Sequence, residues 1–256
     1  MHTTSISVAE TPLVAFCLGH ADDALILSHR LSEWSGKAPT LEEDLALSNI
    51  ALDLIGQARA LYSYVGELTG QSEDALAYLR DEHAYRNLLL VEQPNGDFAV
   101  TIARQFLFTA YADPFWRAMT RATDATLAAI AEKAEKETAY HLRHASEWLI
   151  RLGDGTAESA RRARAALARL WPFTGELFDH DTTAGIFTPT GIAIHPDMVR
   201  PHWDRTVDDV LRRAMLDRPA NGWMQSGGRA GQHSEHFGYL LAELQFLPRS
   251  HPGAQW

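Results

Sequence analysis

The chain has 256 residues, one cysteine and a formal net charge of −10. This length suffices to bury a substantial core without disulfides or metals. The 33 acidic against 23 basic side chains would repel phosphate backbones, which argues against nucleic-acid partners, and no apolar run reaches the roughly 18 to 20 residues of a membrane span.

Cysteine usage and the N-terminus indicate the compartment. Cys17 cannot pair within the chain, and the sequence does not begin with a charged and then apolar leader. We therefore expect a cytoplasmic protein in which Cys17 is a small buried apolar residue.

Residues that typically begin or end helices recur at long intervals, whereas residue patterns typical of strands are nearly absent. The first predicted helix spans residues 12–34, with Thr11 as its cap. The second follows a predicted capping box of Thr40 and Glu43, carries apolar residues at steps of three or four, and ends before Gly70. Such an apolar stripe predicts packing against other helices.

The middle of the chain continues this pattern. Residues 72–92 predict a shorter helical stretch, and Asp97 can cap a further helix that Pro114 should kink or interrupt. Residues 124–152 form an alanine-rich segment long enough for a helix of bundle length.

Thr156 caps a fifth predicted segment that reaches Trp171, and a loop-like stretch follows at residues 179–196. Two more helices are predicted at 197–216 and 233–247. They are separated by residues 222–231, the segment that looks most flexible, which we interpret as a plain connection, with a lid or a partner-binding loop as the alternative. No linker or repeat divides the chain, so the sequence predicts one all-α domain over residues 1–256.

Polar residues on the predicted inner faces need partners or a function. Asp53 and Gln57 lie one turn apart with Arg59 close by, so they form either an internal network or an exposed strip. We expect at least one buried ion pair there.

The long alanine-rich helix carries three residues with metal-binding chemistry on one face. Glu137, His141 and His144 fall at i, i+4 and i+7, a spacing that could hold a metal in principle. A satisfied core histidine with two solvent-facing neighbours is the preferred interpretation. The last predicted helix has His233 and His236 one turn apart, without an aligned carboxylate, which favours packing or hydrogen bonding at a contact between subunits.

Two further features narrow the possible functions. The only arginine-rich stretch is interpreted as a solvated helix face, with docking of an acidic protein or a phosphate-bearing ligand as the alternative; it comprises Arg161, Arg162, Arg164 and Arg169.

None of the 12 histidines is preceded by Glu or Asp at the third position before it. The Glu-x-x-His pairs that bind two iron ions in four-helix bundles are therefore absent.

Several blocks of the sequence resemble the PaaC-type subunit of bacterial phenylacetyl-CoA 1,2-epoxidase. They are residues 30–34 (RLSEW), 52–59 (LDLIGQAR), 87–97 (NLLLVEQPNGD), 140–143 (YHLR), 151–156 (RLGDGT) and 240–245 (LLAELQ). The resemblance implies a ferritin-like bundle with additional C-terminal helices, and a structural role without a cofactor in this subunit. It also implies a homologous catalytic PaaA-type partner with a di-iron centre, a small PaaB-type subunit, and a reductase with flavin and an iron–sulfur cluster.

The resemblance also implies where the metal ligands of the catalytic type have been lost. One Glu-x-x-His position falls on Gly56 and Arg59, and the other on Thr138 and His141. We expect Arg59 to replace iron by its fixed positive charge, paired with an inward acid such as Asp53, and we expect Asp53, Gln57 and Glu137 to form an internal polar network. The alternatives are a di-iron oxygenase subunit with non-standard ligands and an iron-storage or small-molecule-binding bundle.

Overall fold

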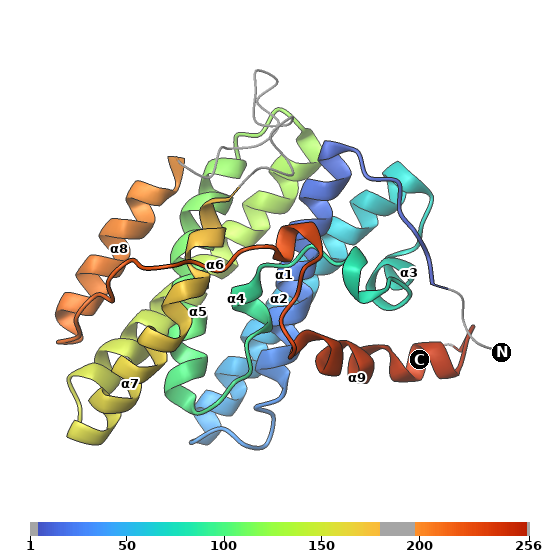
Figure 1. The fold of residues 1–256 in the computed structure, drawn as a ribbon. Coiled ribbons are helices and arrows are strands. Elements are labelled where there is room, and N and C mark those ends of the chain that lie inside the picture. The colour runs from blue at the N-terminus through green and yellow to red at the C-terminus, as the bar shows by residue number, and fades with distance from the viewer. Residues whose placement is uncertain (1–4, 180–197, 255–256) are drawn as a thin grey trace.

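The computed structural model describes residues 5–179 and 198–254, which form α-helices and short 3-10 turns without a β-strand (Figure 1). The all-α prediction is confirmed. Most of the predicted loop at 179–196, and the first residue of the helix predicted at 197–216, lie outside the described residues. No helix in the described part of the chain is long and apolar enough to cross a membrane.

Four long helices form the bundle: α1 (Pro12–Ser32), α2 (Leu41–Thr69), α5 (Phe98–Met119) and α6 (Ala125–Gly153). The most extensive contacts between helices join α1 to α2 and α5 to α6, and α2 also packs on α6. Short connections within each close pair make its helices antiparallel. The arrangement is consistent with a ferritin-like helical bundle.

Local capping sets the helix ends. Thr11, Thr40 and Asp124 each accept a hydrogen bond from a backbone N–H of the first turn that follows, and Gly70 ends α2 with φ of 77°. The predicted capping box at Thr40 forms only in part. The Thr40 hydroxyl accepts from the Glu43 N–H, whereas the Glu43 carboxylate contacts α6 instead. These caps lie within a few residues of the ends they set, which is why the sequence located them.

One prediction for the middle of the chain is wrong. Residues 72–92 do not form one helix but α3 (Glu73–Tyr78), the 3-10 turn η1 (Glu82–Ala84) and α4 (Leu89–Glu92). The backbone N–H groups of Arg86 and Leu88 donate to carboxylates of α1 rather than to carbonyls one turn back. Of the two effects predicted for Pro114, the interruption does not occur, because Pro114 lies inside α5 and the helix continues to Met119.

The remaining helices lie on two sides of the bundle. α7 (Ala157–Leu170) and α8 (Arg200–Arg213) pack on α5 and α6 at the left in Figure 1, and α9 (Phe237–Ser250) lies at the right, in contact with α3. α5 is therefore surrounded and is buried along nearly its whole length. Cys17 is buried in α1, as predicted, and burial raises the pKa of its thiol to about 12, so the thiolate is scarce at neutral pH.

Candidate functional site

The four positions inferred to be former metal-ligand positions lie on α2 and α6. His141 is fully buried, and the Thr138 hydroxyl donates to the Ala134 carbonyl of its own helix (2.8 Å). Gly56 has no side chain to offer. Only His141 brings a ligand atom to the interior.

The fourth position corrects the prediction for Arg59. Its side chain is 68% exposed and pairs with Glu73 on α3, with 3.1 Å between Nη2 and Oε1. Gln57 and Ala58 are the buried residues of this turn, so Arg59 projects outward. The hypothesis that Arg59 replaces iron electrostatically inside the bundle is therefore wrong. A helix places successive residues about 100° apart, so Arg59 faces away from the core when Gln57 and Ala58 face it.

The acids and amide predicted to form an internal network instead bridge α2 and α6 in two separate contacts. Nε2 of His141 lies 3.0 Å from Oδ2 of Asp53, and Nε2 of Gln57 donates to Oε2 of Glu137 (2.9 Å). The Asp53 side chain is 37% exposed, so this pairing lies at the edge of the bundle. Asp53 thus pairs with His141, and the buried pair expected with Arg59 does not form.

A third contact between these helices involves His144. Its Nε2 lies 2.8 Å from Oε2 of Glu43 near the start of α2. In both His141 and His144, Nδ1 is buried without a hydrogen-bond partner, which favours the tautomer in which Nε2–H donates to the carboxylate. His141 and His144 thus pair with separate acids, and no group of three or more ligating side chains that could hold a metal occurs in the described ranges. The preferred interpretation is right for the core histidine His141 and wrong for Glu137 and His144, whose side chains are only 14% and 9% exposed.

His233 has a partner that the sequence did not show. It is fully buried, and its Nδ1 lies 2.9 Å from Oε2 of Glu92, whereas His236 is partly exposed. The expectation that both histidines serve a contact between subunits is wrong for His233, which binds an acid of its own chain.

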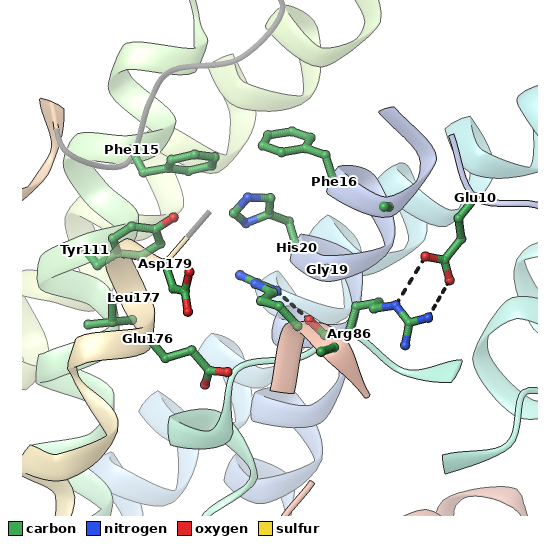
Figure 2. Close-up of a pocket in the computed structure, with 13 residues that line it drawn as sticks. Glu10, Phe16, Gly19, His20, Arg86, Tyr111, Phe115, Glu176, Leu177 and Asp179 are labelled. Atoms are coloured by element: carbon green, nitrogen blue, oxygen red, sulfur yellow. Dashed lines mark hydrogen bonds and ion pairs between the residues drawn. The ribbon is translucent and has the colours of Figure 1, made fainter. Parts of the chain in front are cut away.

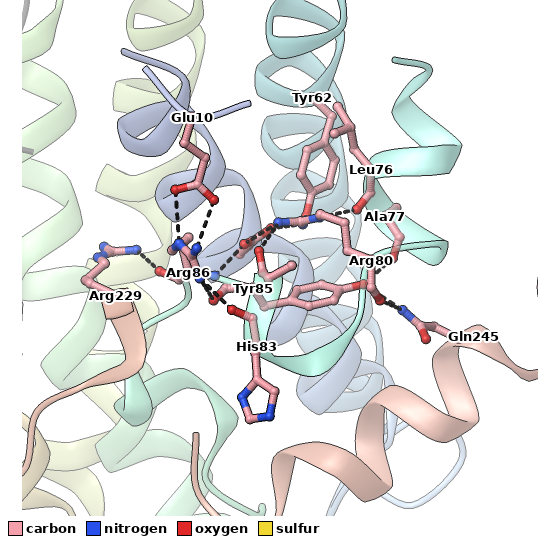
Figure 3. A network of polar contacts seen from close by, with 12 residues as sticks. Glu10, Tyr62, Leu76, Ala77, Arg80, His83, Tyr85, Arg86, Arg229 and Gln245 are labelled. Atoms are coloured by element: carbon pink, nitrogen blue, oxygen red, sulfur yellow. Dashed lines mark hydrogen bonds and ion pairs between the residues drawn. The ribbon is translucent and has the colours of Figure 1, made fainter. Parts of the chain in front are cut away.

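Buried charge is concentrated where α1 meets the segment after α3 (Figure 3). Asp22 and Arg80 are both 0% exposed and form an ion pair, and the Tyr62 hydroxyl also donates to Asp22 (2.5 Å). Gln245 of α9 donates to the Tyr85 hydroxyl and to the Arg80 carbonyl (3.0 and 2.8 Å). This network joins α1, α2, the segment after α3, and α9.

Three further buried acids bind residues 227–234, which comprise the end of the loop predicted to be the most flexible and the residues just beyond it. Glu176 accepts from the N–H groups of Gly227 and Gly228 (2.9 and 2.6 Å), and Asp23 pairs with Arg229 (2.6 Å). Glu92 accepts from the N–H of Ser234, which lies just beyond the loop. Residues 227–231 are therefore bound to the bundle. In the sequence, the sign of this attachment was the presence of acidic residues inside the apolar stretches that form α1 and α4.

Asp23 provides a pH-dependent test of this attachment. Burial raises its pKa from 3.8 to about 6, against the opposing effects of Arg229 and the Leu88 N–H. The folded chain therefore binds more protons than the unfolded chain between about pH 4 and pH 6, so the contribution of Asp23 to stability falls as the pH rises through this window.

We expect Asp23→Asn to remove this contribution. The free energy of unfolding of the variant relative to the wild type should rise between about pH 4 and pH 6 and then level off, as measured by chemical denaturation. Asp154→Asn, which removes an exposed carboxylate, is the matched control. A difference between Asp23→Asn and wild type that stays constant over the window would contradict the assignment.

The arginines of α7 lie on its exposed face. Arg161 and Arg162 both pair with Glu158 (2.8 and 2.7 Å), and Arg162 also pairs with Asp97 at the start of α5. These pairs favour the interpretation as a solvated face.

The whole chain, residues 1–256, matches the protein family described as phenylacetic acid catabolic protein. The chain is also similar to the C-type subunit of the 1,2-phenylacetyl-CoA epoxidase of Escherichia coli (strain K12). The two are 48% identical over 245 residues, which cover 95% of this chain and 99% of the relative. The resemblance noted from the sequence blocks is thereby confirmed.

Proposed function

The chain belongs to the phenylacetic acid catabolic protein family, and on this basis we propose that it is a structural, non-catalytic subunit of a phenylacetyl-CoA 1,2-epoxidase. In this proposal it forms a core complex with a homologous PaaA-type subunit that holds the di-iron centre. A small PaaB-type subunit and a reductase with flavin and an iron–sulfur cluster complete the system.

The observation that carries the proposal is the chemistry at the four inferred ligand positions. A di-iron centre in a four-helix bundle needs inward carboxylates and histidines on facing helices. Gly56 and Thr138 supply no suitable ligand, Arg59 points outward, and His141 pairs with Asp53. These four positions therefore do not fit a di-iron centre.

The outer face of α2 supports assembly with a partner. Leu41, Leu45 and Leu52 recur on it at steps of four and seven residues, and they are 71%, 57% and 64% exposed. Large apolar side chains repeated along one exposed face are typical of protein–protein interfaces. We place the contact with the catalytic subunit on this face.

Co-expression with the candidate catalytic subunit tests the partnership and the face. We expect the two chains to co-elute in size-exclusion chromatography at micromolar concentration, and we expect a variant with both Leu45→Asp and Leu52→Asp to elute alone. The matched control carries Ala165→Asp and Ala168→Asp on the exposed face of α7, which has no large apolar residue at these positions, and should still co-elute. Separate elution of the wild-type chains would contradict the proposal, and co-elution of the α2 variant would contradict the assigned face.

Iron analysis separates the structural role from catalysis by this chain itself. We expect well below one iron per chain after growth with ample iron. A content of about two per chain would instead support a di-iron oxygenase subunit with non-standard ligands.

A further inference from the structure

A cavity of about 180 Å³ lies between α1, α5, the 3-10 turn η3 (Gly175–Phe178) and the 3-10 turn η6 (Gly228–Ala230), as Figure 2 shows. It is separate from the contact between α2 and α6. One wall of the cavity is aromatic and the other wall is charged. The two walls therefore restrict the shape and the charge of any molecule that the cavity could bind.

The aromatic wall consists of rings from α1 and α5. The His20 ring lies nearly parallel to that of Phe115, with centroids 4.4 Å apart, and Tyr111 stacks on the same Phe115 at 5.5 Å. Phe16 meets His20 edge-on at 4.6 Å. Phe16, Phe115 and Tyr111 are only 3%, 1% and 3% exposed, so small parts of these rings are open to an aromatic ligand.

The charged wall offers little free charge. Asp179, which also lines the cavity, is not without a partner. Arg86 pairs with Glu10 (2.9 Å), and Arg229 pairs with Asp23 (2.6 Å). The carboxylate of Glu176 accepts three backbone N–H groups, from Leu89, Gly227 and Gly228. An ionic ligand would therefore lose its hydration without gaining a free counter-charge.

Two polar groups of the aromatic wall remain available. The Tyr111 side chain is only 3% exposed, and its hydroxyl makes no hydrogen bond to any residue of the described ranges. Nδ1 of His20 lies 3.9 Å from the nearest oxygen of Asp23, too far for a hydrogen bond. Burial, together with the charge of Arg229, lowers the pKa of His20 well below its ordinary value, so the ring is neutral at pH 7 and has one donor and one acceptor.

We propose that this cavity binds a neutral, single-ring aromatic molecule that carries a hydroxyl group. The ring packs against Phe16 and Phe115, and the hydroxyl exchanges hydrogen bonds with Tyr111 and His20. The volume suits such a ligand, because an engineered protein cavity of about 150 Å³ takes benzene. The site goes beyond the proposed function and does not depend on it.

Fluorine NMR titration of the full chain with 4-fluorobenzyl alcohol tests the site. We expect saturable binding below about 10 mM, a range open to a ligand of this size. Binding should be lost in Ala15→Leu, which fills the cavity, and kept in the matched Ala60→Leu, which fills the groove between α2 and α6. Absence of saturation, or binding retained in folded Ala15→Leu, would overturn the site.

A second variant and two charged probes test the chemistry. Tyr111→Phe removes one hydroxyl and should weaken binding about fivefold, which corresponds to one net hydrogen bond. 4-Fluorobenzoate and 4-fluorobenzylamine should bind at least about tenfold more weakly than the alcohol. Unchanged affinity in Tyr111→Phe, or preferred binding of either charged probe, would show that the class of ligand is wrong.

Discussion

Asp22→Ala is expected to lower the free energy of unfolding by about 3–5 kcal/mol, because it leaves the charge of Arg80 buried and unpaired. Both side chains are 0% exposed. The change also removes the acceptor of the Tyr62 hydroxyl and of the Arg86 N–H (2.7 Å). Chemical denaturation monitored by circular dichroism measures the loss.

Two controls separate the buried pair from ordinary charge effects. Glu73→Ala removes the partner of the exposed Arg59 and should change stability by less than about 1 kcal/mol. Adding Arg80→Met to Asp22→Ala should restore part of the lost stability, because it removes the unpaired charge. Equal losses in Asp22→Ala and Glu73→Ala would contradict the central role of this network.

Gly228→Ala is expected to detach residues 227–234 from the bundle and to destabilise the chain by about 2–3 kcal/mol. A Cβ atom at this position would lie 2.2 Å from the Asn87 carbonyl oxygen and 3.1 Å from the Leu89 nitrogen. The backbone cannot stay where Glu176 binds it and also clear these atoms. Amide hydrogen exchange of residues 227–234 should therefore become faster.

Gly222 provides the matched control in the same loop. A Cβ atom there meets nothing within 4 Å, so Gly222→Ala should leave both stability and exchange close to the wild type. Protection of residues 227–234 that survives in Gly228→Ala would show that the contacts with the three buried acids do not hold the loop.

Helix positions were predictable wherever the signal was local. Thr11, Thr40, Asp97 and Thr156 each cap the helix that follows, as predicted, because a cap acts on backbone groups two or three residues away. The segment at 72–92 failed for the opposite reason. Its backbone donors bind Asp22 and Asp23, more than 60 residues earlier, and no local pattern shows that competition.

In the candidate site, too, the features encoded locally were predictable and those that depend on helix packing were not. The sequence showed the absence of Glu-x-x-His and the presence of His141, but the direction of Arg59 depends on which face of α2 meets the core. The partner of His233 is 141 residues away along the chain. Side-chain partners across the bundle follow from the relative placement of helices, which spacing within one helix does not determine.

The sequence by itself therefore determined the all-α class, the starts of the long helices and the lack of the usual iron-binding pairs, because periodicity, caps and motifs are encoded by residues close together in the chain. Only the tertiary structure decided which charges are buried and which are paired. Asp22 with Arg80, Asp23 with Arg229, and Asp53 with His141 come from distant segments, and desolvation makes each pairing depend on contacts that exist only after the helices have packed.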